Sequence, residues 1–147
     1  MKITIKDIVD GLLGVWPEME YPWIYDRGTF YAPSLSVVQR AMETSFVPNM
    51  QVVGEFNDCD DFALHFIAEF RRKQYLAWEA KNLPVDRTFP AAIGIVFGDK
   101  FRAEEILHQC CVGVLEEGIY LIDPYPGVAR IWKADPKNDN VIKLAYM

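Results

Sequence analysis

The spacing of apolar residues follows a helical period through the first half of the chain. Residues 1–15 predict a short strand followed by a helical turn, and the aromatic, proline-interrupted segment 16–25 is expected to cover the core. A second helix is expected to begin at the cap residue Ser34 and to stop before Pro48, because its apolar residues recur three and four positions apart. A third helix is expected from the Asn57-Asp58 cap to about Ala80, and one of its faces carries Cys59, Phe62, Ala63, Phe66 and Phe70.

After residue 90 the period of the apolar residues changes to that of strands. Residues 91–97 form a nearly continuous apolar run, which predicts a central strand. Residues 106–115 and 119–123 predict a hairpin that turns at Glu116-Glu117-Gly118, and residues 128–132 and 141–146 predict two further strands. Since helices come first and an antiparallel sheet second, the fold class is expected to be α+β, in a single domain over residues 1–147.

Composition and charge narrow the classes of function. With 51% hydrophobic and 24% charged residues, the chain is expected to be globular. Its net charge of -6 argues against nucleic acid as the main partner, because phosphate binding needs a basic surface. No apolar run approaches the length of a membrane span, and the first residues lack a signal-peptide core, so no membrane partner is expected. The odd count of three cysteines favours a reducing, cytoplasmic location.

Cys59 lies at the expected start of the third helix, on the side that faces the protein. The N-terminal end of a helix favours a thiolate over a thiol, which makes the sulfur a better nucleophile. Asp58, Asp60 and Asp61 act in the opposite direction, since nearby negative charge disfavours a thiolate, so an imidazolium would have to compensate. The alternative is that Cys59 only packs in the core, as most cysteines on an apolar helix face do.

The chain has two histidines, and only one of them is a candidate base for Cys59. His65 is about 240° round the same helix and cannot reach the sulfur. His108 begins an alternating strand face, and Asp123 ends the next strand, where functional groups are often found. A hairpin loop of two or four residues would put His108 and Asp123 on the same face of the sheet, whereas a three-residue loop would put them on opposite faces.

Zinc is another chemistry that a chain with three cysteines and two histidines could support. However, Cys110 and Cys111 are adjacent on one expected strand, so their side chains point to opposite faces. The sequence also contains no Cys-x-x-Cys or His-x₃-His spacing. A structural zinc site is therefore not expected, and Cys110 and Cys111 are expected in the core.

Three features resemble the papain-like and transglutaminase-like cysteine peptidases. They are Asn-Asp-Cys-Asp-Asp-Phe-Ala at 57–63, the strand residue His108 and Leu-Ile-Asp-Pro at 121–124, in the order Cys, His, Asp. Together with Gly-Ile-Val-Phe-Gly at 94–98, they are most similar to the papain-like C-terminal domains of the mushroom-agglutinin type and to related bacterial and phage domains. The resemblance covers roughly residues 25–125 and implies a papain-like fold, in which N-terminal helices, with the cysteine at a helix start, pack on a C-terminal antiparallel sheet.

The resemblance implies a cysteine peptidase or amidase-type hydrolase that acts on a peptide or isopeptide bond of a peptide or protein substrate. Cys59 would be the catalytic nucleophile, His108 the base and Asp123 the residue that holds the imidazole. The backbone N–H of Cys59, with Gln51, would stabilise the oxyanion. Water or an amine would then resolve the thioester, so hydrolysis and acyl transfer both stay open.

Two further functions remain open beside the enzyme. One is a catalytically silent papain-like domain used as a binding or accessory protein, which the acidic residues around Cys59 and the lack of a clear oxyanion side chain favour. The other is a structural domain in which all three cysteines are core. No cofactor is required by the resemblance, which also allows a calcium ion near Asp60 and Asp61.

Overall fold

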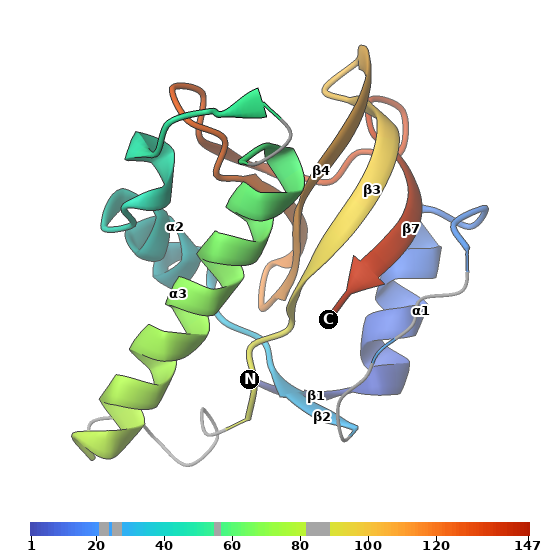
Figure 1. Ribbon diagram of the computed structural model, residues 1–147. Helices are drawn as coiled ribbons and strands as arrows, with labels where there is room; N and C mark the ends of the chain where they lie inside the picture. Colours follow the sequence, from blue (N-terminus) through green and yellow to red (C-terminus); the bar gives the residue numbers. More distant parts are fainter. Residues whose placement is uncertain (21–23, 25–27, 55–56, 82–88) are drawn as a thin grey trace.

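The computed structural model describes residues 1–20, 24, 28–54, 57–81 and 89–147. Its centre is a five-stranded antiparallel sheet, with helices on both faces (Figure 1). Of the segment expected to cover the core, residues 21–23 and 25 lie outside the described residues, whereas Trp16 and Met19 are buried as expected. Among the described residues, no helix has the length and apolar character needed to cross a membrane.

The N-terminal region combines a helix with a small sheet of its own. Strand β1 (Lys2–Thr4) pairs with β2 (Thr29–Tyr31) in antiparallel register. Helix α1 (Ile5–Val15) follows β1 directly, because a capping box stops the strand: the Asp7 carboxylate accepts the Thr4 backbone N–H at 2.7 Å, and the Thr4 hydroxyl accepts the Asp7 N–H at 3.2 Å.

Two further helices follow, as the apolar period predicts. Helix α2 (Leu35–Glu43) begins after Ser34, although its first N–H group, that of Leu35, is satisfied by the Glu117 carboxylate at 2.8 Å. A short 3₁₀ turn, η1 (Val47–Asn49), leads toward α3 (Cys59–Glu79). The predicted start of α3 at the cysteine and its predicted end near Ala80 are both confirmed.

The central sheet has the strand order β6-β5-β4-β3-β7. Its strands are β3 (Ile93–Phe101), β4 (Glu104–Leu115), β5 (Gly118–Asp123), β6 (Arg130–Lys133) and β7 (Asn140–Tyr146). Strands β3 and β4 extend further than the apolar runs predict, because Arg102 and Ala103 form a tight turn, with φ of 51° and 67°, directly after Phe101. The polar residues 98–105 therefore belong to a hairpin.

The sheet separates two buried clusters. On one face, Ile8 and Leu12 of α1 pack with Cys110 and Val112; on the other, α3 packs with the strand residues that point the opposite way. The α3 residues of this second cluster are Phe62, Ala63, Phe66, Ile67 and Phe70. Cys111 belongs to the second cluster, so the prediction that Cys110 and Cys111 are core residues on opposite faces is confirmed.

The expected α+β arrangement, with N-terminal helices packed on a C-terminal antiparallel sheet, is wrong. The antiparallel sheet is the dominant element, and α1 and α3 lie on opposite faces of it (Figure 1). The N-terminal half also contributes the strands β1 and β2. Strands of three residues are too short to show an alternating apolar pattern, which is why the sequence does not distinguish them from loops.

Candidate functional site

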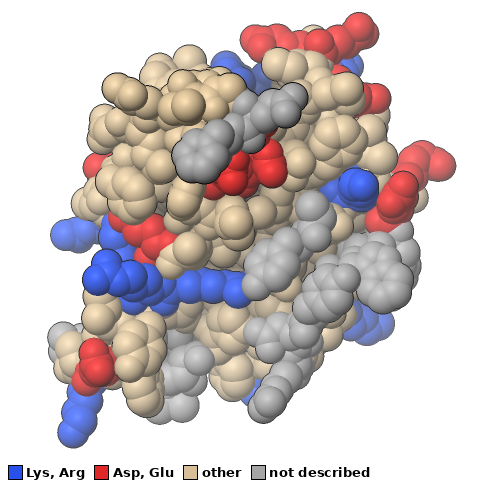
Figure 2. Space-filling model, viewed as in Figure 1, with Lys and Arg blue, Asp and Glu red and all other residues tan. Residues whose placement is uncertain are grey.

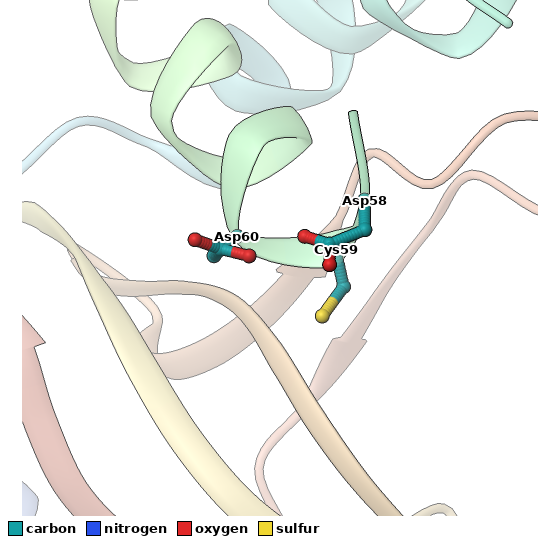
Figure 3. Close-up of side chains that lie close together, drawn as sticks. All are labelled: Asp58, Cys59 and Asp60. Atoms are coloured by element: carbon teal, nitrogen blue, oxygen red, sulfur yellow. The ribbon is translucent and has the colours of Figure 1, made fainter. Parts of the chain in front are cut away.

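The start of α3 places Cys59 beside the sheet. Asp58 is the N-cap residue, and its backbone N–H reaches the Asp61 carboxylate at 3.4 Å, which holds the first turn. Phe62 and Ala63, one turn further on, are fully buried against the strands and fix the helix. Figure 3 shows the Cys59 thiol pointing away from its helix and toward the strands. The sequence prediction that Cys59 lies at a helix start is confirmed, and the thiol is half-buried.

His108 and Asp123 meet on one face of the sheet. Their strands are joined by a two-residue loop, since Leu115 pairs with Gly118, and this resolves the loop length that the sequence left open. In this register Cys110 lies opposite Asp123, and His108, two residues before Cys110, is its diagonal neighbour. The His108 Nε2 atom lies 3.1 Å from Asp123 Oδ2. The Tyr125 N–H donates to the other oxygen, Oδ1, at 3.2 Å, so both carboxylate oxygens are engaged.

The imidazole of His108 is held between two acidic groups. Burial by itself would lower the pKa of His108, but hydrogen bonds and charges from Asp123 and from Cys59 outweigh burial and raise it from 6.5 to about 9. The rings of Phe101 and Tyr125 approach the imidazole edge-on, at centroid distances of 5.7 and 6.2 Å. At neutral pH His108 is therefore an imidazolium that contacts Cys59 on one side and Asp123 on the other.

These three residues line a cleft of about 570 Å³. Its wall is mixed, with apolar and charged side chains contributed by the β3–β4 hairpin and by residues 125–130: Phe101, Glu104, Ile106, Tyr125, Val128 and Arg130. Two polar atoms at the cleft, Asp58 Oδ1 and Arg130 Nε, are buried without a hydrogen-bond partner among the described residues. The Arg130 Nε atom is 3.8 Å from Asp123 Oδ2, and its guanidinium lies over the Trp132 ring.

The other sequence candidates lie outside this group. Gln51 is exposed and is not among the described residues that line the cleft; its backbone carbonyl accepts a hydrogen bond from the Asn57 side chain at 2.6 Å. The structure therefore does not bring Gln51 to Cys59 as an oxyanion group. His65 is exposed on α3, in agreement with the prediction that it cannot reach the sulfur.

The start of α3 also groups three potential metal ligands. Asp58, Cys59 and Asp60 each offer one ligand atom, and these atoms lie within 4.8 Å of one another (Figure 3). A hydrogen bond that Asp60 donates to the Asp58 carboxylate, together with burial, raises the pKa of Asp60, so the two carboxylates share a site that disfavours double ionisation. Calcium takes six to eight oxygen ligands and avoids sulfur. The donor set does not fit calcium, which stays a prediction from the sequence.

Sequence reasoning did not find the residues that complete the cleft. Arg130 lies opposite Asp123 in the register of β5 and β6, and Tyr125 follows Asp123 by two residues. The sequence predicts residues 119–123 and 128–132 as strands. Had these two strands been paired with each other, Arg130 would have been placed next to Asp123. Glu104 lies between the strands predicted over 91–97 and 106–115, and it reaches the cleft because β4 begins at this residue.

No family model matches the sequence, and no curated protein matches it. The fold is shared with solved structures. A crystal structure of Polyporus squamosus lectin bound to the human-type influenza-binding epitope Neu5Aca2-6Galb1-4GlcNAc has a TM-score of 0.73 and 17% identity, over 99% of this chain and 49% of that chain. A PSL1a-E64 complex has a TM-score of 0.71 and 18% identity, over 99% of this chain and 50% of that chain. The chain thus spans about half the length of these two structures.

These similarities contradict the family expected from the sequence. The neighbours are lectin structures, so the resemblance to papain-like and transglutaminase-like cysteine peptidases is wrong, and so are the papain-like fold class and the peptidase or amidase function inferred from it. The motif at 57–63 misled because an acidic cap followed by an apolar helix face is a local arrangement that unrelated folds also contain. At these identities the comparison establishes that the chain has the fold seen in half of each lectin structure.

Proposed function

We propose that this chain is a binding domain and that its ligand lies in the cleft above Cys59, His108 and Asp123. The observation that supports this most is convergence: one side chain from each of α3, β4 and β5 meets the others at a single cleft of about 570 Å³. The buried pair of His108 and Asp123 contributes little net stability to the sheet, because removing the two charged groups from water costs free energy. Such pairs in a cleft are typical of functional sites.

The unpartnered atoms of the cleft support a hydroxyl-rich ligand. Asp58 Oδ1 can accept a hydrogen bond and Arg130 Nε can only donate one. Neither atom makes a hydrogen bond within the described residues, although Arg130 Nε lies 3.8 Å from Asp123 Oδ2 in an ion pair. A hydroxyl group both donates and accepts, so neighbouring hydroxyls of one ligand can satisfy both. Tyr125 adds an aromatic ring to the same cleft. Because a lectin chain that shares this fold over about half its length is bound to a trisaccharide, we propose a short glycan as the ligand class.

Cys59, His108 and Asp123 are proposed to act on this ligand as one unit. The His108 imidazolium would pair with a Cys59 thiolate, and Asp123 would fix the ring through its 3.1 Å contact. The unit is proposed as part of a binding site, and hydrolysis of peptides has no part in it.

The proposal is tested by titrating Neu5Aca2-6Galb1-4GlcNAc into the protein while amide shifts are followed by NMR. We expect saturable shifts at the residues of the cleft. Binding should weaken in Arg130→Gln, which removes the Nε donor, and in Asp58→Asn, which replaces one carboxylate oxygen by an NH₂ donor. Arg72→Gln, which changes an exposed arginine on α3, is the matched control and should bind as the parent does. Shifts that never saturate, or that map away from the cleft, would refute the glycan proposal.

A further inference from the structure

A second cavity, of about 300 Å³, lies between α2 and α3. It shares no lining residue with the cleft above Cys59. Each helix contributes one face, with residues spaced three, four and seven positions apart. From α2 and its C-cap these are Val37, Arg40, Ala41 and Thr44, from α3 they are Phe70, Lys73, Gln74 and Ala77, and Tyr31 of β2 completes the lining.

The cavity exists because small residues stand where the two helices face each other. Ala41 and Ala77 line it, and neither side chain is long enough to fill the space between the helix axes. The helices are nevertheless well anchored, since Val38 beside the cavity and Phe70 in its wall are buried in the core. Seven residues of helix rise about 10 Å, so the two faces make an elongated apolar slot.

The side chains that line this slot include two cations, Arg40 and Lys73, although Lys73 is paired with Glu69 beside the cavity. No acidic side chain lines the cavity among the described residues, whereas the chain carries a net charge of -6. The Lys73 ammonium is held by Glu69 at 2.7 Å and by the Thr44 carbonyl at 3.2 Å. Arg40 is exposed and makes no hydrogen bond or ion pair within the described part of the chain, so its guanidinium is available. Acidic side chains gather elsewhere, for example around the end of the β3–β4 hairpin at the top of Figure 2.

We propose that this cavity binds a monomeric anionic amphiphile, a medium-chain fatty carboxylate. Its aliphatic part would lie in the slot between Ala41 and Ala77, where burial of apolar surface stabilises it. Its carboxylate would pair with the planar Arg40 guanidinium, which can donate two parallel hydrogen bonds. The inference goes beyond the proposed glycan cleft and uses none of its residues.

The test is calorimetric titration of decanoate, below its micelle concentration, into the whole chain. Binding should weaken by at least about tenfold in Arg40→Glu, which reverses the charge, and in Ala77→Trp, which fills the slot. Arg72→Glu, the matched change on the exposed side of α3, should keep the parent affinity, and circular dichroism should show that Ala77→Trp is folded. Decyltrimethylammonium, with the same chain and opposite charge, should bind more weakly than decanoate.

Three results would overturn the proposal: no measurable decanoate binding, equal binding of the cationic analogue, or decanoate binding that survives both Arg40→Glu and Ala77→Trp. The outcome is separable from that of the glycan proposal. Arg130→Gln changes only the cleft and should leave decanoate binding intact. A chain that binds decanoate but no glycan would refute the proposed function alone.

Discussion

Replacement of Asp123 by asparagine removes the negative charge beside His108 while it keeps the size of the side chain. The two side chains are largely enclosed, with 12% of His108 and 4% of Asp123 exposed, and Nε2 lies 3.1 Å from Oδ2. Solvent therefore screens this interaction weakly. Asparagine can still accept the Tyr125 N–H through its carbonyl oxygen, so the backbone turn at 123–125 is expected to persist.

The size of the pKa change expected in Asp123→Asn follows from the opposing effects of burial and of nearby charges on the His108 imidazole. Burial lowers the pKa of His108, and Asp123 with Cys59 raises it to about 9. The difference from 6.5 corresponds to about 3 kcal/mol in favour of the imidazolium. A carboxylate at hydrogen-bond distance raises the pKa of an imidazole by about 1 to 3. Asp123→Asn should therefore bring the pKa of His108 down to roughly 6 to 8.

The measurement is an NMR titration of the ring Cε1–H signals. The chain has two histidines, so His65→Gln assigns the remaining signal to His108. Glu105→Gln, which removes one negative charge from an exposed position on β4, is the control and should leave the titration of His108 nearly unchanged. The reasoning is refuted if His108 of the parent titrates near 6.5, or if Asp123→Asn leaves its pKa where it was.

Three further predictions concern stability. The pKa of His108 is raised in the folded chain, so its protonation stabilises the fold fully below pH 6.5, and this stabilisation is lost as pH rises through about 9. The difference in unfolding free energy between the parent and His108→Gln, measured by urea titration, should therefore shrink by up to about 3 kcal/mol between pH 6 and pH 10. A methyl group at Gly98 would meet the Asn140 carbonyl and the Phe101 ring, so Gly98→Ala should lower the unfolding free energy by about 1 to 3 kcal/mol. Gly14 in α1 has nothing within 4 Å of the added methyl group, so Gly14→Ala should raise the unfolding free energy by up to about 1 kcal/mol. Equal effects of the two variants would contradict the packing around Gly98. Calcium added after EDTA should leave the melting temperature unchanged, because the group of Asp58, Cys59 and Asp60 does not fit this ion, and a rise would instead support the calcium expected near Asp60 and Asp61.

The elements around the site could largely be predicted from the sequence. Apolar residues recur with a helical period in α3 and alternate along β4. These patterns place Cys59 at a helix start and His108 on one strand face. The turn was the undecided point, because Glu116-Glu117-Gly118 suits more than one loop length. Gly118 adopts φ of 122° and pairs with Leu115, which leaves two loop residues and brings Asp123 to the face of His108.

What the sequence could not show depends on pairing between distant segments. Arg130 reaches the cleft because β6 pairs with β5, and Glu104 because a turn at positive φ extends the hairpin. The slot between α2 and α3 is lined by two alanines, Ala41 and Ala77, that the fold brings to one cavity. The motif at 57–63, in contrast, was over-interpreted: it describes a capped helix, and the family drawn from it was wrong.

The most direct test of the central claim, that Cys59, His108 and Asp123 act as one unit, is alkylation of the native protein by iodoacetamide near neutral pH, with peptide mapping of the product. Cys110 and Cys111 are fully buried and should stay unlabelled, whereas Cys59 opens on the cleft and should react. His108→Ala should slow the labelling of Cys59 by about tenfold or more, since the imidazolium that pairs with the thiolate is gone. Labelling of Cys59 at the same rate in the parent and in His108→Ala would contradict the claim.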